Sequence, residues 1–137
     1  SEKNYVSVKG ADSKHIKSER IQYVVEQLCY WRKANHIHKW FVKNVQNGVD
    51  DGEKYIVSLP ELKQLMDVCY EVITDNSKAN ELLPTSYGFF FGGTEYDEWY
   101  FNQTTSTYKI LKEIVEELEE YKTPLNMSAW MEYRASW

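Results

Sequence analysis

The chain has 137 residues and a mass of 16.3 kDa, which suits a single domain spanning residues 1–137. Hydrophobic residues make up 42% and charged residues 27%, both ordinary for a globular protein, while aromatic residues reach 15%. No apolar run approaches the roughly 20 residues that a membrane helix needs. These figures exclude membrane-spanning, collagen-like and disordered classes, and we expect no membrane partner.

The net charge of −5 is unevenly distributed along the chain. Residues 1–50 hold nine Lys and Arg against five Asp and Glu, a balance of +4, and residues 51–137 hold seven against sixteen, a balance of −9. A basic first part can meet phosphate groups, and an acidic second part can repel or imitate them. The alternative, that the two parts complement each other within one fold, is equally open.

The first elements expected are a strand and a long helix. Polar and apolar residues alternate over residues 4–9, which predicts a half-buried strand. Helical spacing then predicts a helix over residues 18–46, ended by Asn47 and Gly48. The apolar stripe of this helix comprises Ile21, Val24, Val25, Leu28, Trp31, Phe41, Val42 and Val45, and it also carries Asn35 and His38.

A second helix is expected to begin after Ser58, which can cap it while Glu61 reaches back and Pro60 occupies the first turn. It should end near Asp75. The residues just before it, 55–57, form a short strand or an extended lead-in, and residues 77–83 are predicted to form a short helix.

A third long helix is predicted from Thr94 to about Tyr121, with Thr94 and Asp97 as a capping box. A break is conceivable at residues 104–107, because Thr and Ser are weak helix formers. The β-forming tail, residues 127–137, is predicted to pair with the strand at residues 4–9. The expected fold is therefore mainly α (α+β): three principal helices with a small antiparallel β element formed by the N- and C-terminal segments.

The two cysteines, Cys29 and Cys69, both fall in apolar helical patterns. Each is interpreted as a small buried hydrophobe in a reducing compartment, although a disulfide between them stays open. No basic-plus-apolar signal peptide is evident, and nothing else in the sequence suggests secretion.

Basic residues recur between positions 32 and 43 of the chain. Arg32, His36, Lys39 and Lys43 follow one another at intervals of four, three and four residues and would share one helical face. With Trp40 at its edge, such a row suits a phosphate and a stacked base, or it is simply a solvated basic face.

The histidines of this segment argue against a metal. His36 and His38 lie two apart and would point in different directions on a helix, so no metal site is predicted. Asn35 and His38 need partners on an apolar stripe, and we expect these in a neighbouring helix or in the loop at residues 84–93. The alternative is that they line a ligand pocket.

The loop over residues 84–93 carries three consecutive Phe between glycines. Gly92, Gly93 and Thr94 precede a helix start and resemble an anion site, but the G-K-[ST] ending is absent and Asp97 competes for the helix dipole. The alternative is an aromatic plug that closes the core.

An acidic segment covers residues 113–120 and includes Glu116, Glu117 and Glu120. It forms either a solvated helix face or an imitation of nucleic-acid phosphates directed at a basic partner.

Two motifs, W-R-K-A-N-H-I-H-K-W-F at residues 31–41 and L-L-P-T-S-Y-G-F-F-F-G-G-T-E-Y-D at residues 82–97, resemble those of small, uncharacterised proteins encoded by bacteriophages and prophages. The resemblance covers about residues 25–115. It implies a phage protein working in the cytoplasm of a bacterial host, a setting in which small proteins often antagonise host defence. The family brings no catalytic residues.

Our first hypothesis is a non-enzymatic counter-defence protein that sequesters a nucleotide-derived signalling molecule, with no cofactor and with assembly into a homo-oligomer. The basic residues would meet phosphate, the aromatic residues would stack on a base, and the amide and imidazole would recognise polar edges. The predicted ligand-binding residues are Arg32, Lys33, Asn35, His38, Lys39, Trp40, Lys43, Tyr87, Phe90, Tyr96 and Asp97.

Two alternatives remain. The acidic third helix could occupy the nucleic-acid channel of a host nuclease, so that the partner is a host defence protein. The third hypothesis is a small enzyme acting on a nucleotide, with His38 and Asp97 as acid and base.

Overall fold

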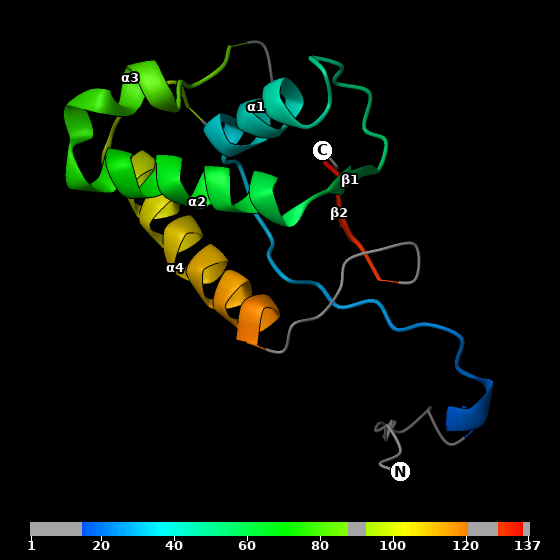
Figure 1. The fold of residues 1–137 in the computed structure, drawn as a ribbon. Helices are drawn as coiled ribbons and strands as arrows, with labels where there is room; N and C mark the ends of the chain where they lie inside the picture. Colours follow the sequence, from blue (N-terminus) through cyan, green and yellow to red (C-terminus); the bar gives the residue numbers. More distant parts are fainter. Residues whose placement is uncertain (1–14, 88–92, 121–128, 136–137) are drawn as a thin grey trace.

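The computed structural model describes residues 15–87, 93–120 and 129–135 (Figure 1). The fold is mainly α with a small antiparallel sheet, as expected. The elements in chain order are η1 (Ser18–Arg20), α1 (Asn35–Asn44), β1 (Tyr55–Val57), α2 (Leu59–Thr74), η2 (Asn76–Lys78), α3 (Ala79–Leu82), α4 (Glu98–Glu120) and β2 (Met131–Tyr133).

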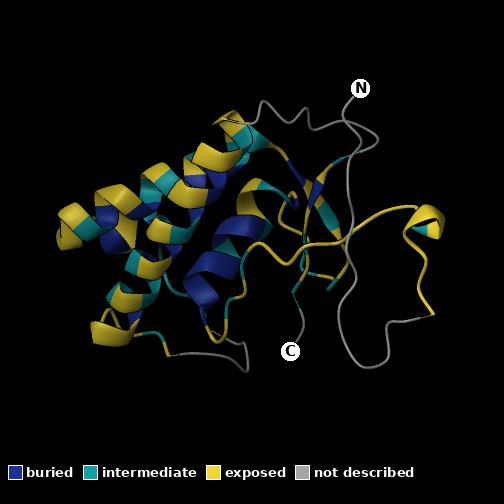
Figure 2. Ribbon diagram, turned by 90° about the horizontal axis from the view of Figure 1, so that it is seen from below, coloured by how far each residue is buried: buried dark blue, intermediate teal, exposed yellow. Residues whose placement is uncertain are grey.

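The core is built where α2 packs against α4 and where α1 is enclosed. One face of each long helix is buried, including Leu65 and Cys69 on α2 and Leu111 on α4. Six of the ten residues of α1 are buried, so this short helix is central, and Figure 2 shows it mostly in the colour of buried residues.

The predicted helix over residues 18–46 is wrong in its first half. Only the short η1 turn forms there, and residues 21–34 adopt neither helix nor strand. Val24 and Val25 are 71% and 83% exposed, so this part of the predicted stripe does not pack on the core, whereas Trp31 further along does. Since most helical stability comes from packing of an amphipathic face, the pattern alone does not suffice. Lys33, two residues before α1, has a left-handed backbone conformation with a φ of 56°.

The second helix matches its prediction. The Ser58 hydroxyl accepts a hydrogen bond from the Glu61 N–H, and the Glu61 carboxylate accepts one from the Ser58 N–H. Asp75 follows its last residue, and the short helix predicted next is present as η2 and α3. Asn47 and Gly48 have positive φ after α1, where the stop was expected.

The third long helix begins four residues later than predicted. Asp97, rather than Thr94, acts as its cap, since Asp97 Oδ1 accepts from the Tyr100 N–H at 3.0 Å. The helix is continuous through residues 104–107, because packing of the buried Thr104 and Thr107 side chains outweighs their weak helix propensity. Their hydroxyls are satisfied by donating to carbonyls one turn earlier.

The sheet joins β1 and β2 in antiparallel register, with Tyr55 opposite Tyr133 and Val57 opposite Met131. The C-terminal segment therefore supplies a strand, as predicted, but its described partner is the lead-in to α2. Val57 and Met131 are buried on the core side of the sheet, which gives this pairing its hydrophobic contribution. The strand predicted at residues 4–9 lies outside the described residues.

Candidate functional site

Asn35 ties α1 to both ends of the aromatic loop. Its Nδ2 donates to the Gly93 carbonyl at 2.8 Å, and its Oδ1 accepts from the Ser86 N–H at 3.0 Å. The expected contact between Asn35 and the loop is confirmed. With 2% of its surface exposed, this amide works as a buried cross-link that sets where residues 84–87 lie.

We give the name Lys39–Tyr87 surface to Lys39, which is partly buried, together with Lys43 and Tyr87, which are exposed. Lys39 Nζ donates to the Thr85 carbonyl at 3.4 Å, a long bond. Tyr87 is 84% exposed two residues further along, and Lys43 is exposed one helical turn from Lys39. The structure therefore places Lys39 at the loop, while Lys43 follows it on α1 and Tyr87 follows Thr85 in the chain.

Other predicted residues are dispersed. Arg32 and Lys33 are exposed but precede α1 instead of lying on it. Trp40 is 7% exposed in the core, where its ring meets Phe41 edge-on at 5.3 Å. Phe90 lies outside the described residues.

The basic face expected across α1 is wrong, because His36 is a core residue. Its Nε2 bonds with the Thr104 hydroxyl at 3.1 Å, and its ring lies 4.2 Å from that of Tyr100. Burial lowers the pKa of His36 to about 4, so the imidazole is neutral at pH 7 and adds no positive charge.

A cluster that the sequence did not reveal surrounds His38. Its Nδ1 bonds with the Tyr133 hydroxyl at 2.7 Å, and its Nε2 with Asp50 Oδ1 at 2.9 Å. Tyr133 also stacks on Phe41 with ring centroids 3.8 Å apart. Burial and the negative charge of Asp50 raise the pKa of the Tyr133 hydroxyl, which keeps it protonated. The cluster thus fastens β2 and the residue-50 loop to α1.

The acid–base pair hypothesised between His38 and Asp97 is not what the structure shows. Both ring nitrogens of His38 are engaged as above, while Asp97 caps α4. Tyr96 likewise has a structural contact, since its hydroxyl donates to Asn80 Oδ1 at 2.8 Å. Asp50 and Tyr133 lie 12 and 95 residues from His38, so no local pattern could have found them.

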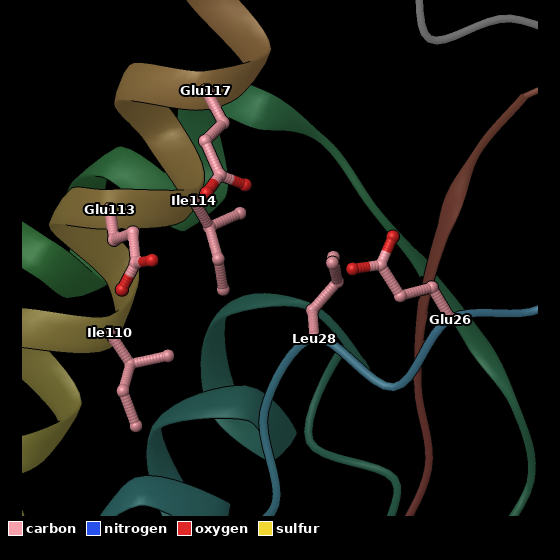
Figure 3. Close-up of a pocket in the computed structure, with 6 residues that line it drawn as sticks. All are labelled: Glu26, Leu28, Ile110, Glu113, Ile114 and Glu117. Atoms are coloured by element: carbon pink, nitrogen blue, oxygen red, sulfur yellow. The ribbon is translucent and has the colours of Figure 1, made fainter.

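A cleft of about 230 Å³ separates α4 from the chain that precedes α1 (Figure 3). We call it the acidic cleft. The α4 wall presents residues spaced as one helical face, and the opposite wall comes from the extended segment. Its lining residues are Glu26, Leu28, Ile110, Glu113, Ile114 and Glu117.

The lining of this cleft is partly apolar and partly acidic. Three aliphatic side chains give an apolar lining, and three carboxylates surround it. Sequence analysis identified the acidic segment over residues 113–120, but it placed Glu26 and Leu28 within a helix and so missed the second wall.

The cysteines offer no reactive group. Both are free, and burial raises the pKa of Cys29 to about 11 and that of Cys69 to about 12. Within residues 15–87, 93–120 and 129–135, no cluster of three or more His, Cys, Asp or Glu is arranged to hold a metal ion. In the same part of the chain, no helix combines the length and apolar character needed to span a bilayer.

Comparisons with known proteins gave no matching family model, no matching characterised protein and no matching solved structure. The resemblance to phage-encoded proteins therefore stays a prediction.

Proposed function

We propose that this chain is a non-enzymatic binding protein whose acidic cleft and neighbouring α4 carboxylates capture a basic segment of a partner protein. The observation that carries the proposal is the combination of an apolar lining with carboxylates from two separate parts of the chain. In the setting implied by the phage resemblance, the partner is a host defence protein that handles nucleic acid, and binding inhibits it.

The spacing on α4 supports this proposal. Glu113, Glu117 and Glu120 recur at intervals of four and three residues and share one exposed face. They extend over about 10 Å of helix, a reach comparable to a short run of backbone phosphates. Glu119 is engaged by Lys63 and is not part of this row.

The apolar lining adds selectivity. A basic side chain alone is better hydrated in water than inside the cleft. An aliphatic side chain flanked by Lys or Arg fills the cleft, while the charges of its neighbours lie at the rim. The preferred ligand is thus a basic, partly apolar peptide.

Fluorescence anisotropy with a labelled peptide tests this proposal. The probe carries two Arg on either side of a Leu–Val pair, and its counterpart carries Glu in place of Arg. We expect micromolar binding of the basic probe alone, weakening with salt and falling at least tenfold in Glu117→Lys. Glu71→Lys, an exposed change on α2, is the matched control. Equal binding of both peptides, or binding insensitive to Glu117→Lys, would refute the proposal.

A second candidate is sequestration of a nucleotide-derived signal at the Lys39–Tyr87 surface. The observation that favours it is the Asn35 cross-link, which holds residues 84–87 beside Lys39 and leaves Tyr87 exposed for stacking. Calorimetry with cyclic nucleotides and ADP-ribose derivatives tests it. Binding should be lost in Tyr87→Ser, and no heat at tens of micromolar would refute it.

A further inference from the structure

The segment over residues 15–30, which we call the arm, exposes an unusual amount of apolar surface. Tyr23 is 78% exposed and Tyr30 is 69% exposed, in addition to the two valines between them. Figure 1 shows the arm leading away from the helices, and Figure 2 shows it in the colour of exposed residues. Apolar side chains that gather on a surface in this way mark an interaction site.

The arm also has a charge pattern. Its beginning is basic, with His15, Lys17 and Arg20 against Glu19 alone, and the apolar residues from Ile21 onward follow directly. Basic residues followed by aliphatic residues complement the carboxylates and the aliphatic lining of the acidic cleft.

The basic part of the arm does not reach the cleft of its own chain. Glu26 and Leu28 already form one wall, so this stretch is fixed beside α4. η1, which holds Arg20, stands well away from α4 (Figure 1). Between the two walls the cleft remains open, and the basic end of an arm is free to reach a neighbouring molecule.

We propose that the arm of a second copy of this chain enters the acidic cleft, and that reciprocal exchange forms a two-fold homodimer. Ile21 of each arm packs on Ile110 and Ile114, and Arg20 and Lys17 meet the carboxylates of Glu113 and Glu117. Isologous pairs of this kind are the commonest form of homo-oligomer. This inference rests on the proposed function, because it names the occupant that a basic partner must displace.

Analytical ultracentrifugation over a range of concentrations tests the exchange. The wild-type chain should approach twice 16.3 kDa as concentration rises. Ile21→Asp, Arg20→Glu and Glu117→Lys should each weaken the dimer at least tenfold, and the double variant Arg20→Glu with Glu117→Lys should recover most of the loss. Because Arg20 and Glu117 are exposed and Ile21 is only partly buried, circular dichroism should show unchanged folding.

Matched controls separate this contact from general surface effects. Ile56→Thr removes another exposed aliphatic side chain, on the sheet, and Lys54→Glu reverses another exposed charge, so both should leave the dimer intact. A monomer at every concentration, or a dimer that the arm variants leave unchanged, would overturn the inference. In that case the basic probe would still bind the cleft if the proposed function holds. Failure of the probe to bind Arg20→Glu, in which the arm no longer competes for the cleft, would count against the function.

Discussion

Tyr133→Phe gives a direct measure of the cluster around His38. The change removes one oxygen atom, the hydroxyl bonded to His38 Nδ1 at 2.7 Å, and leaves the ring stacked on Phe41. His38 is 4% exposed, so water cannot readily replace the lost partner. A buried polar group deprived of its hydrogen bond costs about 1–3 kcal/mol. For a domain of this size, that corresponds to a fall in Tm of about 4–10 °C.

Tyr55→Phe is the matched control, since Tyr55 lies directly opposite Tyr133 in the sheet. Its hydroxyl donates to Asp51 Oδ2 at 2.8 Å, but this bond is exposed and water can replace it. We expect less than about 1 kcal/mol from the control. Urea unfolding followed by tryptophan fluorescence gives both free energies. Equal effects of the two substitutions would refute the argument that burial makes the His38 bond important.

Three further outcomes follow from burial and capping. The pKa of His36 falls from 6.5 unfolded to about 4 folded, so protonation favours the unfolded chain and stability is lost as pH drops from about 6.5 towards 4; the wild-type free energy of unfolding should decline more steeply over that range than that of His36→Gln. The raised pKa of Cys69, about 12, predicts that a thiol reagent at pH 8 modifies it only in denaturant, and rapid labelling of the native protein would contradict this. Ser58→Ala, which removes the cap of α2, should cost about 0.5–2 kcal/mol in the same urea assay, and an unchanged midpoint would show that the capping box contributes nothing.

The sequence predicted the features whose causes are local. The Ser58 capping box and the extent of α2 followed from residues within one turn of each other. The length of α4 followed from its apolar period, although its start was misplaced because Thr94 and Asp97 are both good caps and only contacts along the chain decide between them.

The candidate site was less predictable. The pattern that suggested a helix through Val24 and Val25 is real, yet the described chain there is extended. That misplacement hid the acidic cleft, because Glu26 and Leu28 were assigned to a helix face instead of to a wall opposite α4. The same misplaced helix led to the prediction of a continuous basic face, which is interrupted because His36 is buried.

The sequence by itself determined the helical class, the cap of α2, the acidic character of α4 and the need of Asn35 for a hydrogen-bond partner, and the structure showed that partner to be the aromatic loop. Only the tertiary structure decided that His38 meets Asp50 and Tyr133, that Trp40 is core, and that the arm and α4 enclose a cleft. The physical reason is that capping and periodicity act over a few residues, whereas burial and side-chain pairing depend on segments far apart in the chain. The aromatic residues illustrate this difference. Composition gives their share, 15%, but only packing determines which of them are exposed.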